Sequence, residues 1–337
     1  MWGVMEYWMK LFLITTFTVL GILTFGVSCS SSVRTKETIT VAHAPFESTA
    51  LLSIAQDQQF FSQNGLIVTT KKYDTGVGAL EGMVRGDADI AEGTAEFPMV
   101  RSAFNKEKIR VIGSIDRAEV IYLIGRKDHG IAQVADLKGK KVATAVGTIA
   151  EFYLGRFLIL NGMNMQDITL VDLATPAEWV NAIVNGDVDA IAIAQPHAGL
   201  IQKELGANAV AWSAQSNQPL YTLMIAGDDW ITQHPETIRR FLKSLAQAEE
   251  YLIRNPAEAK SIVQQQLNLD SGYMETVWSQ NQFSLFLDQS LVLAMEDEAR
   301  WMIDNQLTPE TQVPDFLDYI YEDGLKAVKP QAVNILR

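Results

Sequence analysis

The chain has 337 residues, 48% of them hydrophobic and 20% charged, which is a globular composition with enough length for two lobes. Its formal net charge of −13 leaves no basic surface for a phosphate backbone, so nucleic acid is excluded as an expected partner. The single cysteine excludes a disulfide within the monomer and a cysteine-rich metal site.

The N-terminal segment has the pattern of an export signal. A basic residue is followed by an uncharged apolar run over residues 11–27, which ends at small residues. A membrane-spanning helix needs about 20 apolar residues, and this run is shorter, so we expect cleavage. The sequence therefore predicts a signal peptide over residues 1–28, with both Met1 and Met9 open as its start.

Cys29 follows this segment directly. The sequence Gly26-Val27-Ser28-Cys29 resembles the lipobox of bacterial lipoproteins, which implies lipidation of Cys29 after cleavage before it. Lipoboxes usually have Leu where Gly26 stands, so ordinary secretion stays open as the alternative. Residues 29–36 then form a short polar tether. We expect an exported protein, periplasmic or on the outer face of the cytoplasmic membrane, anchored by its lipid.

After the tether, β-branched runs alternate with helical patterns, which is typical of a parallel α/β arrangement. A strand over residues 37–42 precedes a helix over 48–61 and a strand over 66–71. Further strands are expected over residues 109–115, 120–125, 141–145, 168–171 and 221–226. From His234 onward the pattern is almost wholly helical. The fold class is therefore α/β, with mostly parallel sheets flanked by helices and a helical C-terminal segment.

A repeat indicates two similar lobes. Residues 83–91 (Met-Val-Arg-Gly-Asp-Ala-Asp-Ile-Ala) match residues 183–191 (Ile-Val-Asn-Gly-Asp-Val-Asp-Ala-Ile) at a spacing of 100 residues. In both copies an apolar helix ends at Gly, and Asp-x-Asp leads into a strand of small residues. Because Asp and Gly are ordinary turn formers, we expect these aspartates to shape the helix-to-strand turn rather than bind a ligand.

Three features together carry a family resemblance: the paired Gly-Asp-x-Asp repeat, residues 136–142 (Asp-Leu-Lys-Gly-Lys-Lys-Val) before a Gly-Thr helix start, and the helical C-terminal third. They resemble the periplasmic solute-binding proteins of ABC importers for nitrate, sulfonate, taurine or thiamine-pyrimidine precursors. The resemblance covers nearly all of the chain after the tether. It implies a two-lobed periplasmic-binding-protein fold of type II, whose lobes close on the ligand like a hinge.

The resemblance also implies domain boundaries and partners. Crossovers would fall near residues 124–126 and 220–222, so lobe I would span 37–124 and 222–337, and lobe II would span 125–221. The expected partners are a small-molecule ligand, an ABC permease with its ATPase subunit, and the membrane through the lipid on Cys29. The carrier is expected to be a monomer.

Open α/β sheets bind ligands beyond the carboxyl ends of their strands, and this rule selects the candidate binding residues. In lobe I they are Phe46, Ser48, Thr49, Gly76, Val77 and Thr94. In lobe II they are Gly147, Thr148, Gln195 and His197, with Thr222 at the second crossover. Ser48 as a plain N-cap is a competing interpretation. At Thr148, unpaired N–H groups favour a bound anion, whereas a capping box with Glu151 would satisfy the same donors.

The ligand class stays open at this stage. A helix start suits a sulfonate-like or nitrate-like oxyanion, whereas Glu92, Glu96 and Glu151 suit a neutral or cationic heterocycle. The four histidines have no metal-ligand spacing and Cys29 is the only thiol, so we predict no metal, no cofactor and no catalytic residue. An exported ligand sensor is one alternative, and an enzyme of precursor biosynthesis on the same fold is another.

Overall fold

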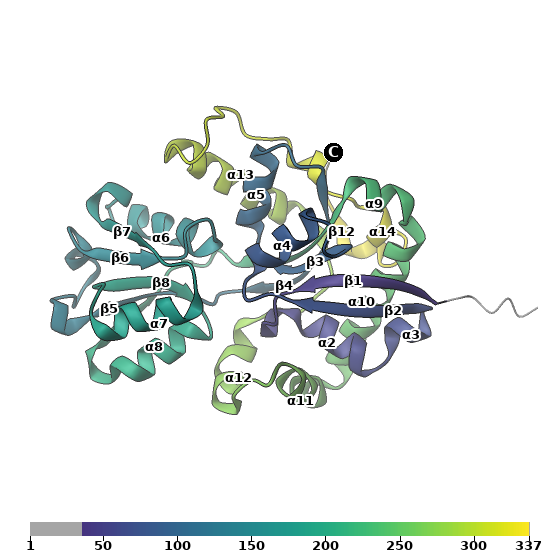
Figure 1. Ribbon diagram of the computed structural model, residues 1–337, viewed down its shortest axis with the longest axis horizontal. Coiled ribbons are helices and arrows are strands. Elements are labelled where there is room, and N and C mark those ends of the chain that lie inside the picture. The colour runs from purple at the N-terminus through teal and green to yellow at the C-terminus, as the bar shows by residue number, and fades with distance from the viewer. Residues whose placement is uncertain (1–35, 337) are drawn as a thin grey trace, which may run out of the picture. The chain divides into compact units, whose positions relative to one another are not determined.

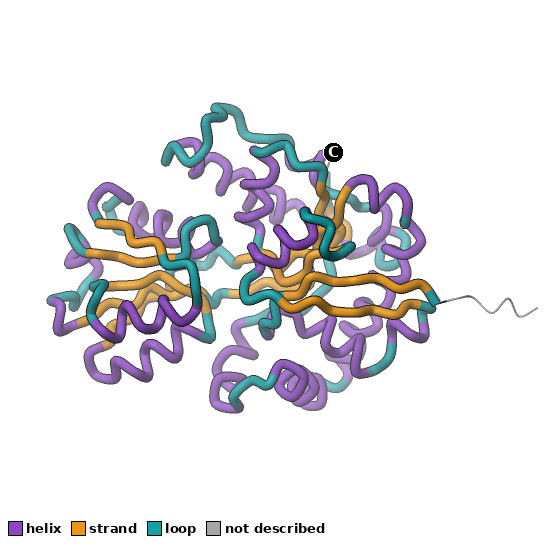
Figure 2. Tube along the Cα trace, viewed as in Figure 1, coloured by secondary structure: helices purple, strands orange, loops and turns teal. Residues whose placement is uncertain are grey.

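The computed structural model describes residues 36–336, so the predicted signal peptide, Cys29 and nearly all of the tether lie outside the described residues. The described part contains two five-stranded sheets with helices on their faces (Figures 1 and 2). We call the first sheet with its helices lobe I, and the second sheet with its helices lobe II. The predicted α/β class is confirmed.

The sheet of lobe I has the order β2-β1-β3-β10-β4, and β10 runs antiparallel to both neighbours while the other four strands share one direction. Its strands are β1 (Glu37–His43), β2 (Leu66–Lys72), β3 (Ile90–Thr94), β4 (Ile109–Ala118) and β10 (Leu220–Gly227). The helices among them are α2 (Ala50–Asp57), α3 (Phe60–Gln63), α4 (Gly76–Val84) and α5 (Glu96–Phe104), with a 3-10 turn at Glu47–Thr49.

The sheet of lobe II repeats this plan with the order β7-β6-β8-β5-β9, and here β5 is the antiparallel strand. Its strands are β5 (Ile121–Arg126), β6 (Lys141–Thr144), β7 (Thr169–Asp172), β8 (Ala190–Ala194) and β9 (Ala209–Ser213). Its helices are α6 (Ile149–Leu160), α7 (Pro176–Asn185) and α8 (His197–Leu205). Each sheet is thus mixed, with a single antiparallel strand.

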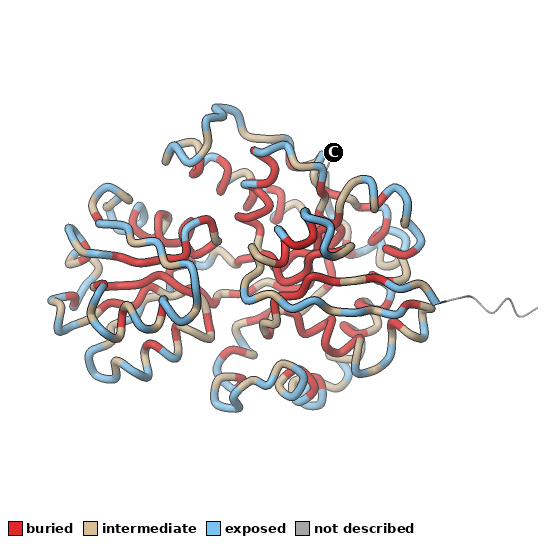
Figure 3. The backbone as a smooth tube through the Cα atoms, in the orientation of Figure 1, coloured by how far each residue is buried: buried red, intermediate tan, exposed pale blue. Residues whose placement is uncertain are grey.

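The C-terminal part is mainly helical, as predicted, and belongs to lobe I. It contains α9 (Asp228–Gln233), α10 (Pro235–Arg254), α11 (Pro256–Leu267), α12 (Ser271–Val277), α13 (Gln289–Asp304) and α14 (Asp323–Lys326), with short strands β11 (Leu287–Asp288) and β12 (Val333–Asn334). The apolar face of α10, including Ile238, Phe241 and Leu245, is buried. Figure 3 draws the buried residues of the described chain in red. The helix therefore packs its apolar stripe on the lobe I core.

The chain passes between the sheets earlier than the resemblance implied. It leaves lobe I between β4 and β5, at residues 119–120, and returns between β9 and β10, at residues 214–219. The expected crossing at 124–126 was wrong, because these residues lie within β5, which pairs with β8 and β9 of lobe II. Residues 220–222 likewise already belong to β10 of lobe I. The apolar run that begins at Val120 predicts a strand, but its sequence does not show which lobe that strand joins.

A buried glutamine joins the two crossings. The side chain of Gln215, which is fully buried, accepts hydrogen bonds from the backbone N–H groups of Val120 (2.6 Å) and Ile121 (2.8 Å). Its amide nitrogen donates to the carbonyl of Ala118 (2.9 Å). Backbone groups at a strand break would otherwise be left unpaired in the interior. Gln215 therefore satisfies them and fixes the crossings side by side.

The lobes also meet through aromatic side chains of α5, α6 and α13. The ring of Phe152 in α6 lies 6.0 Å from that of Phe97 in α5 and 5.7 Å from that of Trp301 in α13. All three residues are buried. A Cβ atom added at Gly155 would lie 2.3 Å from the Trp301 ring, so this glycine permits the close approach. One hydrophobic core consequently extends from lobe I into α6 of lobe II.

Candidate ligand-binding site

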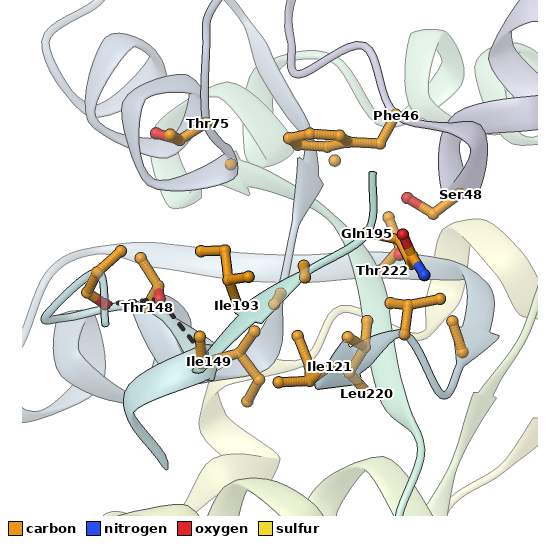
Figure 4. Close-up of a pocket in the computed structure, with 18 of the residues that line it drawn as sticks. Phe46, Ser48, Thr75, Ile121, Thr148, Ile149, Ile193, Gln195, Leu220 and Thr222 are labelled. Carbon is orange, nitrogen blue, oxygen red and sulfur yellow. Dashed lines mark hydrogen bonds between the residues drawn. The ribbon is translucent and has the colours of Figure 1, made fainter. Parts of the chain in front are cut away.

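A pocket of about 140 Å³ lies between the lobes and is lined by residues of both (Figure 4). Lobe I contributes the loop after β1, the start of α4, the segment between β3 and α5, and the start of β10. Lobe II contributes the start of α6 and the segment after β8. The first crossing lines the pocket through Val120, and Ala118 at the end of β4 and Leu220 at the start of β10 also line it. The pocket thus lies at the strand ends and hinge, where a binding site was expected.

Most of the predicted binding residues line this pocket: Phe46, Ser48, Gly76, Val77, Thr148, Gln195, His197 and Thr222. Figure 4 shows Ser48, Gln195 and Thr222 grouped at one end, with Thr148 and Ile149 at the other. The aromatic ring of Phe46 lies across the pocket from Ile121 in the same view. Elements far apart in sequence therefore bring these side chains together, while ligand contact by each of them stays a prediction.

Three predicted residues, by contrast, do not line the pocket. Thr94 is fully buried and its hydroxyl donates to the carbonyl of Gly76 (2.9 Å). Thr49 is also fully buried, and its hydroxyl donates to the carbonyl of Phe46 (2.6 Å). Gly147 lies in a neighbouring cleft beside Arg101. The two threonine hydroxyls are occupied by backbone carbonyls, so their predicted hydrogen bonds to a ligand are corrected.

Two glycines bring the start of α4 against the end of β3. A Cβ atom at Gly76 would lie 2.4 Å from the carbonyl oxygen of Gly93, far inside van der Waals contact. Gly93 itself has φ +86°, and a Cβ atom there would lie 2.8 Å from the carbonyl oxygen of Ala44. Only glycine tolerates both restrictions at low cost. At the start of α4 and the end of β3, lobe I therefore presents mainly backbone and small side chains to the pocket.

The repeated aspartates have the structural role that we expected. In lobe I, the Asp89 carboxylate accepts a hydrogen bond from the N–H of Thr40 (2.7 Å), in the middle of β1. In lobe II, the Asp189 carboxylate accepts from the N–H of Lys141 (2.9 Å), at the start of β6. These bonds tie each helix-to-strand turn to the neighbouring strand, at the end of the sheet away from the pocket. The duplication therefore sets strand register.

In lobe II the segment after β8 supplies polar side chains to the pocket. The Gln195 side-chain oxygen accepts from the N–H of Gly199 (3.0 Å), which fixes the amide at the start of α8. The ring of His197 lies edge-on to that of Trp179, with centroids 5.0 Å apart. Burial lowers the pKa of His197, so its imidazole is neutral at pH 7. The Trp179 indole N–H donates to the carbonyl of Leu173 (2.7 Å).

An acidic side chain, Glu47, also lines the pocket. The Tyr273 hydroxyl donates to its carboxylate (2.5 Å), and burial raises the pKa of Glu47 above its ordinary range. Asp116 lies close by, and its pKa is raised well above the usual range, chiefly by burial and then by the charge of Glu47. Among the described lining residues, Glu47 has the only acidic or basic side chain besides the neutral His197. The wall is otherwise largely apolar.

The start of α6 is closed by its own carboxylate. Glu151, which is buried, accepts a hydrogen bond from the N–H of Gly147 (2.7 Å), and the Thr148 hydroxyl accepts from the N–H of Ala150 (3.3 Å). Burial raises the pKa of Glu151, and the Arg101 guanidinium partly opposes this effect. Of the two interpretations open for this helix start, the hydrogen bonds favour the cap.

The other histidines are engaged away from the pocket. The Nδ1 atom of His43 lies 2.6 Å from the buried carboxylate of Glu92, a pairing that the sequence did not reveal. His129 is paired with Asp189 (2.7 Å). Within residues 36–336, no group of three or more His, Cys, Asp or Glu side chains is arranged to hold a metal ion. No helix in that range is both long and apolar enough to span a membrane.

Several lining residues were missed by sequence reasoning. Glu47 stands between two predicted residues, and Thr75 precedes the predicted glycine loop. The remainder are apolar residues at strand ends and helix starts: Ala95, Pro98, Ala118, Val120, Ile121, Ala145, Ile149, Ala150, Ile193, Ala194 and Leu220. Apolar residues of this kind cannot be distinguished from core by pattern alone, because both environments select the same side chains. Only the positions of the two crossings could have indicated that some of these apolar residues line a pocket.

Comparisons with known proteins agree with this architecture. The chain is 25% identical over 242 residues to a putative binding protein of Brucella abortus, covering 69% of this chain and 72% of that one. It is 25% identical over 224 residues to the taurine-binding periplasmic protein of Escherichia coli, covering 65% and 67%. It is 24% identical over 240 residues to the 4-amino-5-hydroxymethyl-2-methylpyrimidine phosphate synthase of Aspergillus parasiticus, covering 64% and 65%.

The fold is shared with solved binding proteins. The alkanesulfonate-binding protein of Xanthomonas axonopodis pv. citri, solved bound to MOPS, matches with a TM-score of 0.72 at 20% identity, over 86% of this chain and 98% of that one. This likeness confirms the two-lobed periplasmic-binding-protein fold. The family described as NMT1/THI5 like matches residues 47–259, which is more than half of the chain. The protein therefore belongs to the NMT1/THI5-like family.

Proposed function

We propose that this protein is the solute-binding component of an ABC importer, which captures a small molecule between its lobes and delivers it to the permease and ATPase subunits. The observation that carries the proposal is the pocket, because both lobes and the first crossing contribute to its wall. A ligand that contacts both lobes stabilises the closed state through its differential affinity for that state. Relatives that are named as binding proteins support the proposal.

Catalysis has little support in the geometry. The one histidine that lines the pocket, His197, packs against Trp179 and has no carboxylate partner among the described residues. The buried His43–Glu92 pair does have such a partner, but neither residue lines the pocket. A general base must lie within hydrogen-bond reach of the group that it deprotonates. We therefore propose a carrier rather than an enzyme, although one relative is a synthase.

The proposed lobe boundaries follow the crossings. Lobe II would comprise residues 121–213 and lobe I the rest of the described chain, with Gln215 at the hinge. We further propose a monomer that is exported and held at the membrane by a lipid on Cys29. Replacing Cys29 with Ser would then release the protein into the soluble fraction and abolish labelling by radioactive palmitate, whereas unchanged membrane retention would contradict the anchor.

The carrier function is tested by a thermal-shift screen with sulfonates, nitrate, amides and pyrimidines, followed by small-angle X-ray scattering. A ligand that binds only the native state raises the melting temperature, and hinge closure lowers the radius of gyration. We expect at least one solute to do both. A Gln195→Ala variant assigns these responses to the pocket, because it should reduce both the rise in melting temperature and the fall in radius of gyration. A hit that is chemically converted during incubation would favour the enzyme instead.

A further inference from the structure

Among the described residues, the pocket wall has no cationic side chain, although the relatives of this protein include proteins named for taurine and sulfonate binding. Two basic residues lie near the lining segments without lining the pocket. Arg117, next to Ala118, is paired with Asp288 and lies over the ring of Phe286 (4.0 Å). Arg101 lines the neighbouring cleft beside Gly147. A buried anion would therefore have no compensating side-chain charge in this pocket.

Two backbone donors near the pocket are bound by side chains of the protein itself. At the start of α6, the N–H of Gly147 is bound by the Glu151 carboxylate. At the start of α4, the N–H of Gly78 donates to the Thr75 hydroxyl (3.1 Å). Free N–H groups at helix starts are the usual means of binding an anion without a cation. These two helix starts carry their own caps, and one of the caps is a carboxylate.

The electrostatic environment opposes a negative ligand further. Glu47 lies in the wall, Asp116 is buried close to it, and Glu151 is buried at the start of α6. An added anion would lie near three carboxyl groups in an environment that screens charge weakly. Burial already raises the pKa of all three groups, so an anion would either be repelled by a carboxylate or raise these pKa values further, whereas a neutral donor-bearing group meets carboxyl oxygens there.

The rest of the wall suits a ring. Apolar side chains from both lobes enclose the space, among them Phe46, Val77, Pro98, Ile149, Trp179, Ile193 and Leu220. Ser48, Gln195 and Thr222 are grouped at one end, whereas the hydroxyls of Thr75 and Thr148, at the other end, cap α4 and α6 (Figure 4). An apolar pocket with few polar groups at one side orients a ligand that has one polar end.

We infer that the solute of this pocket is a ring-sized, mostly apolar molecule without negative charge, whose polar end donates hydrogen bonds toward Ser48, Gln195 and Thr222, rather than a sulfonate-like anion. This inference rests on the proposed carrier function and specifies its substrate class. The members of the family that are named for sulfonates then differ from this protein in the charge of the ligand.

The test uses two matched pairs of probes, benzamide with benzoate and benzenesulfonamide with benzenesulfonate. Each pair keeps the ring and replaces a neutral NH₂ donor with an anionic oxygen. Isothermal titration calorimetry at pH 8, supported by thermal shift, measures the dissociation constants on the full mature protein. We expect each amide to bind at least tenfold more tightly than its anion, because the anion loses hydration without gaining a cation.

Two variants assign the discrimination to the pocket. Glu47→Gln removes the wall carboxylate and should reduce the amide preference at least threefold, whereas Glu204→Gln makes the same change at an exposed site and should leave it unchanged. Equal or tighter binding of either anion overturns the inference and leaves the carrier function intact. So does a solute screen in which only anions close the lobes. If no solute closes the lobes, the carrier function itself fails.

Discussion

The two lobes share a duplicated structural frame, namely the Gly-Asp-x-Asp turns and the strands that they hold, but they differ at the pocket. Asp89 and Asp189 accept hydrogen bonds from equivalent positions of β1 and β6, so the repeat gives both sheets the same local geometry. At the opposite ends of β3 and β8 the lobes diverge. After β3 the Thr94 hydroxyl is bound to the carbonyl of Gly76, and Gly93 and Ala95 line the pocket, whereas after β8 lobe II presents the side chains of Gln195 and His197.

This difference shows that duplication conserves the position of a site but not its chemistry. The frame depends on turn residues whose side chains bind backbone and have no contact with the pocket. The residues just past each strand are free to vary, since they contribute little to strand register. We therefore expect variants in the frame and the hinge to change stability, and variants past the strands of lobe II to change affinity.

The largest effect is expected where the lobes join. Gln215→Ala would leave the buried N–H groups of Val120 and Ile121 and the carbonyl of Ala118 without their partner. Unpaired buried groups cost about 1–3 kcal/mol each, so we expect a loss of ~3 kcal/mol in the free energy of unfolding. Urea denaturation measures it. Gln218→Ala, three residues away, is the control and should change stability by under about 0.5 kcal/mol.

A somewhat smaller loss of stability is expected for one of two glycines in α4. Gly76→Ala places a methyl group 2.4 Å from the Gly93 carbonyl oxygen, so strand and helix must separate, and we expect a loss of ~2 kcal/mol. Gly78→Ala meets its nearest atom at 3.4 Å and should be neutral or slightly stabilising, because Ala is the better helix former. Equal melting temperatures for the two variants would show that the close approach is unimportant.

A third comparison concerns a buried acid pair in lobe I, Glu96 of α5 and Glu298 of α13. Burial raises the pKa of Glu96 from 4.5 to about 7, and burial together with the neighbouring Glu96 raises the pKa of Glu298 well above its usual range. The folded protein therefore holds protons that the unfolded chain releases above pH 4.5. The resulting stability is fully present below that pH and is lost as pH rises through about 7.

The variant Glu298→Gln tests this pair by removing one titrating group while keeping its shape. Between pH 5 and 8 we expect Glu96 alone to cost ~2 kcal/mol of unfolding free energy and Glu298 to add to this cost, so the variant, which keeps Glu96, should lose clearly less stability than the wild type. Glu204→Gln, at an exposed position, should reproduce the wild-type dependence. Denaturant titrations at four pH values measure the unfolding free energy. If it depended on pH equally in both variants, the acid pair would be excluded as the cause of the pH dependence.

The sequence predicted the fold well because its signals are local. Alternation of strands and helices and the Gly-Asp-x-Asp turns depend on neighbouring residues, and these features appear where expected. The crossings were misplaced because the strand β5 continues an apolar run that starts at Val120. Gln215 gave no signal at all, since its role depends on two strands that are distant in sequence.

The site was predicted by position more accurately than by side chain. Thr94 and Gln195 both follow a small-residue strand, and the sequence treats them alike. The left-handed backbone at Gly93, with φ +86°, precedes Thr94, whose hydroxyl is bound to a backbone carbonyl, whereas Gln195 reaches the pocket. A side-chain direction of this kind depends on backbone angles and packing that no single-sequence pattern encodes.

The smallest effects are expected for Thr94 and Gln195, where one substitution should change stability and the other affinity. Thr94→Val keeps the shape but removes the hydrogen bond to Gly76, so we expect ~1 kcal/mol less stability and no change in affinity for benzamide. Gln195→Ala should weaken benzamide binding about fivefold, because a polar contact in the pocket is lost, while the melting temperature of the free protein changes little. Calorimetric affinities and melting temperatures of both variants give the two readouts independently. If Thr94→Val weakened binding as much as Gln195→Ala did, the ends of β3 and β8 would have equivalent roles. The assignment of Thr94 to structure and of Gln195 to ligand contact would then be wrong.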